Sequence, residues 1–193
     1  MKLYFRMLLL LRRLRHLAKV STKDTIEFKS RVWPTDLDIN GHMTNTRYVS
    51  LFDLSIIQVF SQLGLVTSLS KMKWQAMINA RNISFLRELS PFEPFKVTSE
   101  IICWDRSFLY MEHKIVNKQN KTSSICYSRG LFLSKKGLIS FKELLKNAID
   151  NGKGPTDGLE AFEAGSPPMP DHIKHWKETL KHQKKQIKSS DAS

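Results

Sequence analysis

The feature that most constrains the fold is an apolar segment at residues 45–63. Its large apolar side chains do not keep to one side of a helical projection: they are Val49, Leu51, Phe52, Leu54, Ile56, Ile57, Val59, Phe60 and Leu63. A helix that is apolar on nearly all sides must be enclosed by the rest of the protein. Thr44 or Asn45 is a suitable N-cap, and Gly64 is a suitable stop. The sequence therefore predicts a buried helix around which the other elements fold.

The segments after this helix are typical of strands. They lie at about 74–89, 95–104, 107–117 and 122–134, and the stretches between them are rich in turn-forming residues. Another strand, at about 25–33, precedes the helix and ends at Pro34. Long strands with short connections favour an antiparallel meander. The expected fold class is α+β, with one antiparallel sheet wrapped around one long central helix. A sheet of this size leaves an edge and an apolar patch, so a dimer is expected.

The chain divides into four expected regions. Residues 1–20 are predicted to form a basic amphipathic helix, and residues 21–150 the folded domain, whose last part is a short helix at 140–149. The segment 151–170 is rich in Gly and Pro and is expected to be a linker. Residues 171–193 are expected to be a basic C-terminal tail.

The net charge of +13 is concentrated at the two ends of the chain. Residues 1–20 hold six basic and no acidic side chains, and residues 171–193 hold six basic and three acidic ones, so nine of the thirteen charges lie in the ends. A nucleic-acid-binding fold would carry this charge on its body, so we expect no nucleic acid partner. The N-terminal helix has two readings. It lies on an anionic membrane, or it packs on the domain or on a partner subunit.

Several kinds of site find no support in the sequence. The longest apolar run near the N-terminus, Met7–Leu11, is far too short to span a membrane. Cys103 and Cys126 lie in strand-like segments and read as buried free thiols, so no metal site is expected. The sequence contains no nucleophile elbow and no phosphate-binding glycine loop. We expect a cytoplasmic protein that can lie peripherally on a membrane, with no cofactor.

A polar loop directly precedes the apolar helix. Its polar and flexible residues, together with the first residue of the helix, are Asp36, Asp38, Asn40, Gly41, His42 and Asn45. Hydrolysis of an acyl bond needs a group that attacks the carbonyl or activates water, and a group that holds the oxyanion. A carboxylate supplies the first, and the N–H groups at a helix N-terminus supply the second. This loop places both kinds of group within one local element.

The loop and the strands that follow carry a family resemblance. The pattern D-x-D-x-x-G-H-x-x-N-x-x-Y at residues 36–48, with RVWPTDLD, FLRELSPFEPF, CWDRSFLYMEHKIV and RGLFLSKKG, resembles the hotdog-fold acyl-CoA thioesterases related to 4-hydroxybenzoyl-CoA thioesterase, including the membrane-associated THEM-type branch. The resemblance covers roughly residues 25–145. It implies a hotdog dimer with acyl-thioester sites where two subunits meet, or a dimer of such dimers. It also implies that Asp38 is the catalytic carboxylate and that N–H groups at the helix start polarise the carbonyl.

Three residues are the expected catalytic candidates, and each has a structural alternative. Asp38 acts as base or nucleophile, or it braces the turn. His42 orients water or donates to the carbonyl, or it is a structural histidine. Asn45 orients the substrate, or it caps the helix. Asp53 is an alternative carboxylate, and pairing with an arginine such as Arg81 or Arg87 is its structural alternative.

The substrate is expected to contact Gly41, Phe52, Trp74 and Phe85. Gly41 permits a close approach of the backbone or is an ordinary turn glycine. The three aromatic residues are expected to line a tunnel for the acyl chain. Tyr48 reads as a core residue. The phosphates of CoA have four candidate contacts, none of which the sequence singles out: Lys73, Arg81, Arg87 and Arg129.

The leading expectation is an acyl-CoA thioesterase of lipid metabolism that releases a free acid and CoA. Two alternatives stay open. One is a hydratase or dehydratase of the same fold, although such enzymes have an Asn-Pro after their aspartate, which this chain lacks. The other is a non-catalytic, membrane-peripheral protein that binds acyl groups or lipids, which the basic N-terminus favours.

Overall fold

The computed structural model describes residues 3–14 and 16–190. The helices are α1 (Leu3–Leu14), the 3-10 helix η1 (Pro34–Asp36), α2 (Asn45–Gln62), α3 (Leu65–Met72), α4 (Phe141–Asp150), α5 (Gly158–Ala164) and α6 (Asp171–Ser190). The strands are β1 (Ile26–Arg31), β2 (Gln75–Phe85), β3 (Pro94–Trp104), β4 (Leu109–Asn117), β5 (Thr122–Ser134) and β6 (Gly137–Ile139). The fold class is therefore α+β, as predicted.

The strands form one antiparallel sheet in the order β1-β3-β4-β5-β2, with β6 paired to β5. Strands β3, β4 and β5 form a meander, but β2 pairs with β5 and not with β3. The meander prediction is therefore wrong for β2. Strand β1 occupies the edge of β3 where β2 was expected. The two-residue period shows which face of a strand is buried, but it does not show which strand lies beside it.

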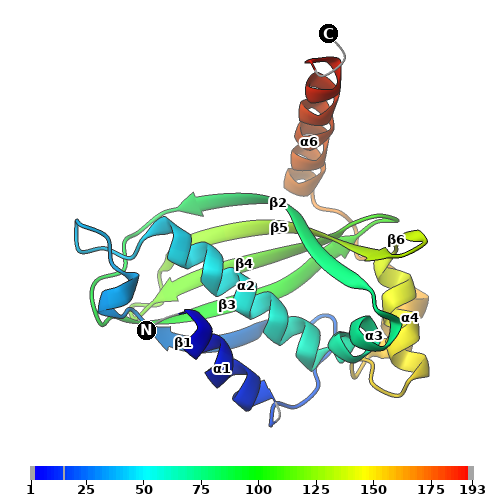
Figure 1. Cartoon of the computed structure of the whole chain (residues 1–193), viewed down its shortest axis with the longest axis horizontal. Coiled ribbons are helices and arrows are strands. Elements are labelled where there is room, and N and C mark those ends of the chain that lie inside the picture. Colours follow the sequence, from blue (N-terminus) through cyan, green and yellow to red (C-terminus); the bar gives the residue numbers. More distant parts are fainter. Residues whose placement is uncertain (1–2, 15, 191–193) are drawn as a thin grey trace.

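Helix α2 lies across one face of the sheet, and α1 lies beside it near β1 (Figure 1). Leu51 and Phe52 of α2 are fully buried, and Val59 is 1% exposed. The register shifts in three strand pairs, for example between Ile101 and Cys103 of β3. Such bulges bend strands, which helps a sheet to curl around a helix. Helix α2 is therefore buried against a curled antiparallel sheet.

Helix α2 ends within one residue of the predicted position. Gly64 follows with φ +73°, and a Cβ at this position would lie 1.5 Å from the carbonyl oxygen of Lys153. Only glycine fits there, which explains the stop. The short helix α3 that follows was not predicted. In the described part of the chain no single helix is long and apolar enough to cross a membrane, although α2 and α3, bent by 89°, meet that test as a pair.

Helix α1 is shorter than the predicted helix over 1–20, of which Met1, Lys2 and Arg15 lie outside the described residues. One side of α1 packs on the domain through Leu10, with Met7 and Leu14 partly buried beside it. The other side exposes large apolar residues, namely Tyr4, Phe5, Leu8, Leu9 and Leu11. One side of α1 is therefore consistent with packing on the domain, and the other side with contact to a membrane.

The expected linker at 151–170 contains helix α5. Its start is fixed by Asp157, whose carboxylate accepts hydrogen bonds from the Ser21 and Thr22 hydroxyl groups at 2.7 Å. Burial would raise the pKa of Asp157, but these hydrogen bonds and the Thr22 N–H outweigh it and lower the pKa. The Gly and Pro content of this segment reflects a tight turn and not a free linker, because Gly158 lies against Ile149 of α4.

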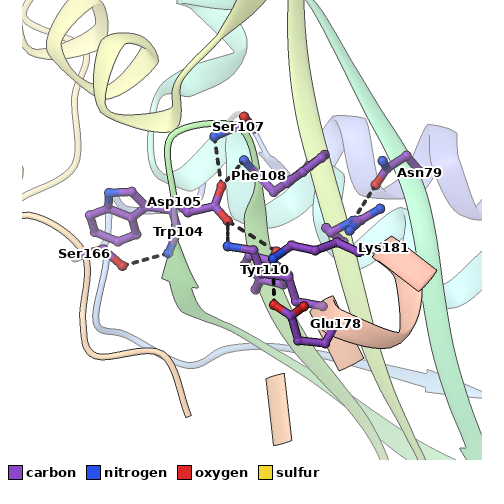
Figure 2. A network of polar contacts seen from close by, with 11 residues as sticks. Asn79, Trp104, Asp105, Ser107, Phe108, Tyr110, Ser166, Glu178 and Lys181 are labelled. Carbon is purple, nitrogen blue, oxygen red and sulfur yellow. Dashed lines mark hydrogen bonds and ion pairs between the residues drawn. The ribbon is translucent and has the colours of Figure 1, made fainter. Parts of the chain in front are cut away.

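Helix α6 begins on the sheet face opposite α2 and then projects away from the domain (Figure 1). Its first turn buries Ile173 against Cys103 and Tyr110. Asp105 accepts hydrogen bonds from the Ser107 and Phe108 N–H groups at 2.8 Å, as Figure 2 shows, and from the Lys177 ammonium at 2.6 Å. The expected C-terminal tail is therefore a helix that is anchored at its beginning.

Candidate active site

The polar loop and the start of α2 surround one cavity of about 370 Å³, which we call the loop cavity. It is lined by Asp38, Asn40, His42, Met43, Asn45, Tyr48, Phe85, Leu86, Arg87 and Glu88. All three expected catalytic residues and the expected substrate contact Phe85 lie at it. Residues from two parts of the chain thus meet here: the loop before α2, and the end of β2 with the residues that follow it.

The Asp38 carboxylate is held by the backbone of its own loop. Its Oδ1 accepts hydrogen bonds from the Asn40 N–H at 2.9 Å and the His42 N–H at 3.2 Å. The Asp38 N–H donates to the His42 carbonyl at 2.9 Å, and Gly41 turns the chain with φ +76°. Among the described residues Oδ2 has no hydrogen-bond partner. Asp38 therefore braces the turn with one oxygen and leaves the other available at the cavity.

Asp36 fixes the base of this loop. It is fully buried, and its Oδ2 lies 2.5 Å from Arg6 Nη2 of α1. The backbone N–H of Trp33 also donates to this oxygen at 2.9 Å. Its Oδ1 lies 3.5 Å from Arg47 Nε of α2. The Thr44 N–H also donates to the Asp36 carbonyl at 2.9 Å. Three separate elements are thus joined at Asp36, which sets the path of the chain into α2.

The first turn of α2 has no side-chain cap. Thr44 occupies the N-cap position, but its hydroxyl oxygen lies 2.9 Å from the Thr46 hydroxyl and accepts no capping hydrogen bond. No acidic residue lies in this turn. The first N–H groups of a helix have no partner within the helix, and the helix dipole favours negative charge beside them. Asn45, the first residue of α2, is exposed and lines the cavity, so this positive end faces the space that Asp38 borders.

Two further groups shape the polarity of the loop cavity. His42 Nε2 lies 3.0 Å from the Glu88 carboxylate, which lies a few residues after β2. Burial, followed by the charges of Glu88 and Glu93, raises the pKa of Tyr48 to about 12. The phenol of Tyr48 therefore stays protonated at neutral pH and can donate a hydrogen bond. Its ring also packs edge-on against Phe85, with the centroids 5.2 Å apart.

The remaining expected site residues lie apart from the loop cavity. Phe52 of α2 is fully buried, and its ring centroid lies 5.6 Å from that of His113 on β4. Trp74 lies at a different cavity beside α3 and β6. Asp53 is ion-paired with Arg81, which was its structural alternative, and its side chain is half exposed. Gly41 shapes the loop but does not line the cavity.

Tyr48, Arg87 and Glu88 also line the loop cavity, and the sequence singles out none of them as a site residue. Tyr48 reads from the sequence as core, and it is both 3% exposed and a lining residue. Arg87 is one of four basic candidates for the phosphates, and only the structure distinguishes it. No sequence pattern points to Glu88 as a site residue, because its proximity to His42 depends on the pairing of β2 in the sheet. Within the described residues, no group of three or more His, Cys, Asp or Glu side chains is placed to hold a metal ion.

This chain is similar in sequence to several known proteins. Protein THEM6 of Xenopus laevis is 24% identical over 146 residues, which cover 75% of this chain and 63% of that protein. A probable thioesterase of Saccharomyces cerevisiae is 29% identical over 133 residues, which cover 66% of this chain and 50% of that protein. The matched region thus spans less than two thirds of either relative.

Solved structures show the same fold. A hypothetical protein of Staphylococcus aureus, in complex with CoA, superposes with a TM-score of 0.60 at 17% identity, over 81% of this chain and 95% of that one. The probable thioesterase YbaW of Escherichia coli superposes with a TM-score of 0.56 at 14% identity, over 63% of this chain and 95% of that one. The family model described as "Thioesterase-like superfamily" matches residues 32–177, which include the polar loop, α2 and strands β2 to β6. The resemblance found in the sequence is therefore confirmed, and the chain belongs to the thioesterase-like superfamily.

Proposed function

We propose that the protein is an acyl-CoA thioesterase that acts at the loop cavity. One observation carries the proposal: a carboxylate with a free oxygen, Asp38, and the uncapped positive end of a buried helix, at Asn45, border the same cavity. These are the two kinds of group that thioester hydrolysis requires. Membership of the thioesterase-like superfamily supports the same reaction.

In the proposed reaction the thioester carbonyl oxygen lies at the first N–H groups of α2, and the carbonyl carbon faces Asp38. The carboxylate either takes a proton from a water that adds to this carbon or adds to it directly. The oxyanion is stabilised by the N–H groups, and the Tyr48 phenol is a further donor at the cavity. In the first route the carbon–sulfur bond then breaks, and the proton taken by Asp38 passes to the leaving sulfur. In the second route the carbon–sulfur bond breaks to leave an anhydride between the acyl group and Asp38, and water hydrolyses this anhydride, which regenerates the carboxylate and supplies the proton for the CoA thiolate. Hydrolysis yields one free acid and one CoA.

Recognition of CoA is assigned to the mouth of the same cavity. Arg87 is the guanidinium among the lining residues, and its Nη1 donates to the Thr122 carbonyl at 2.6 Å, which fixes its position. A fixed guanidinium suits a phosphate group. The structural neighbour solved with CoA supports this choice of leaving group.

The proposal includes a homodimer, or a dimer of such dimers. Strand β2 pairs with β5 on one side, and no other described strand pairs with its second edge. Met77 and Phe85 of β2 are 48% and 44% exposed. An open edge with exposed apolar residues favours pairing with a second copy. Because β2 ends at the loop cavity, a subunit paired along β2 would contribute to the wall of that cavity.

We also propose that α1 contacts an anionic membrane from the cytoplasmic side. Tyr4, Leu8 and Leu11 are exposed on the outer side of α1, and Arg12 and Arg13 stand near its end. An apolar face with basic flanks is typical of an interfacial helix. The double variant Tyr4→Asp/Leu8→Asp should lose binding to vesicles that contain phosphatidylserine. Equal binding of the variant would contradict this contact.

A thiol-release assay tests the reaction. The protein is incubated with acyl-CoAs from four to eighteen carbons, and free CoA thiol is followed. The Asp38→Asn variant should lose about 100-fold or more in kcat, because the amide neither attacks nor accepts the proton. The matched variant Asp53→Asn should keep activity, because Asp53 is paired with Arg81 away from the cavity.

The outcomes separate this proposal from its alternatives. If Asp53→Asn loses activity and Asp38→Asn keeps it, the assigned site is wrong. Binding of acyl-CoA without thiol release in any substrate would favour a non-catalytic acyl-binding protein. Hydration of enoyl-CoA without thiol release would favour a hydratase.

A further inference from the structure

A second cavity of about 470 Å³, which we call the α1 cavity, lies between α1 and the free edge of β1. Leu54 of α2 and Pro94 at the start of β3 complete its wall. The position of α1 beside β1 is visible in Figure 1. None of its lining residues lines the loop cavity. It is therefore a separate place in the fold.

The wall of the α1 cavity combines apolar side chains with positive charge. Its apolar part includes Leu9, Leu10, Phe28, Trp33 and Leu54. Its charged residues are Arg6, Arg13, Lys29 and Arg31, and no acidic residue is among the lining residues. Binding sites for small molecules are commonly apolar cavities of this size with a few charged groups that fix the ligand.

The four basic side chains differ in whether they already have hydrogen-bond or ion-pair partners. Arg6 is 7% exposed and pairs with Asp36, yet its Nε–H is buried without a hydrogen-bond partner among the described residues. Arg31 donates to the Phe92 carbonyl at 2.7 Å. Arg13 and Lys29 are exposed, and neither side chain has a hydrogen-bond or ion-pair partner in the described part of the chain. Two cations are thus free to bind an anion at the rim.

We propose that the α1 cavity binds a single-chain anionic amphiphile. The chain lies among the apolar residues near Leu9 and Phe28, and the carboxylate or phosphate head contacts Arg13 and Lys29. Charge complementarity supports this ligand class, because an acidic head meets the two free cations Arg13 and Lys29, and no acidic residue lines the cavity. An uncharged amphiphile would not gain these two ion pairs. The site does not depend on thioester hydrolysis at the loop cavity.

Isothermal titration calorimetry tests the site. The anionic ligands are decanoate and decyl phosphate, both below their critical micelle concentration, and decanol is the matched uncharged ligand. We expect binding of at least one anion and weaker binding of decanol. The variant Arg13→Glu should weaken binding about tenfold, and Arg13→Glu/Lys29→Glu should weaken it further. The matched control is Arg12→Glu, which makes the same charge change one residue away, outside the cavity wall, and should bind like the wild type.

Two further arms identify the source of the ligand and separate the two sites. Vesicles of phosphatidylcholine with added lysophosphatidic acid present a lipid headgroup, whereas the titrations present a free monomer. Binding in either form that depends on Lys29, which lies on β1 and not on the membrane-facing side of α1, supports the proposal. Asp38→Asn should bind the amphiphile like the wild type, whatever its thioesterase activity. The proposal is overturned if neither anion binds, if decanol binds as tightly, or if Arg12→Glu and Arg13→Glu weaken binding of the free monomers equally.

Discussion

Two aspartates of one loop, two residues apart, have opposite surroundings. Asp36 is fully buried between the arginines of α1 and α2, whereas Asp38 is exposed at the loop cavity. A buried charge needs partners, and Asp36 has two. An exposed carboxylate with one free oxygen can react. At the scale of single residues, position in the loop therefore separates a structural aspartate from a candidate catalytic one.

This difference predicts that the same substitution affects stability much more at Asp36 than at Asp38. Asp36→Asn should lower the free energy of unfolding by about 3 kcal/mol, because it leaves the buried Arg6 charge without its partner. Asp38→Asn should change it by less than about 1 kcal/mol, since Asp38 is exposed. Urea denaturation of both variants measures the two values. Equal losses would show that Asp36 is not the anchor of the loop.

Arg87 provides a second test at the residue scale. Arg87→Ala should raise KM for an acyl-CoA about tenfold, because a contact to a phosphate is lost. KM for the matching acyl-pantetheine, which lacks the nucleotide phosphates, should not change. Arg129→Ala is the matched control, since Arg129 bonds to Asn79 and stacks on Phe108 away from the loop cavity. An equal rise for both substrates would rule out the phosphate contact.

At the residue scale, part of the candidate site could be predicted from the sequence. The residues that precede α2 directly could be predicted, because a carboxylate and a helix start that are close in sequence are close in space. The sequence places Tyr48 only in the core, because a buried residue and a residue that lines a cavity occupy the same apolar positions along a helix. Glu88 and Arg87 reach the site only through the pairing of β2, which no local pattern reports.

At the scale of elements, α2 and the sheet enclose a buried polar cluster. The Ser99 hydroxyl lies 2.7 Å from His113 Nδ1, and the Ser55 hydroxyl lies 2.6 Å from that of Ser99. His113 is fully buried, and its Nε2 has no hydrogen-bond partner among the described residues. Burial, followed by the charge of Arg81, lowers the pKa of His113 to about 3. The imidazole therefore stays neutral in the folded protein at neutral pH.

The lowered pKa predicts a dependence of stability on pH. Between pH 6.5 and about 3 the unfolded chain binds a proton at His113 that the folded chain does not, so stability falls as the pH falls through this window. The slope from this residue approaches about 1.4 kcal/mol per pH unit, and it is absent above pH 6.5. His113→Gln should remove this part of the slope. Denaturation of both proteins from pH 4 to 8 measures the difference, and parallel curves would contradict the assignment.

At the scale of the whole molecule, the open edge of β2 is the feature that points to assembly. The edge ends at the loop cavity, so the site and the proposed dimer share one border. A second copy would cover exposed apolar residues of β2 and close one side of the cavity. Activity and assembly are therefore expected to change together.

Met77→Asp tests this link, because it places a charge on the exposed part of β2. It should shift the protein from dimer to monomer in analytical ultracentrifugation and reduce thiol release in parallel. Leu138→Asp is the control, since Leu138 is 57% exposed on β6, away from this edge. A fully active Met77→Asp monomer would show that the site needs no second subunit.

The buried helix, the strands and the loop with Asp38 at the helix start follow from the amino-acid sequence alone. These depend on periodicity, turn residues and short separations along the chain, which local physical chemistry controls. Other features arise only from the folded arrangement: β2 lies beside β5, Arg6 pairs with Asp36 thirty residues away, and α1 and β1 border a second cavity. Such contacts join segments that are distant in the sequence. Their free energy comes from side chains that meet only when the whole sheet has formed, so no local pattern encodes them.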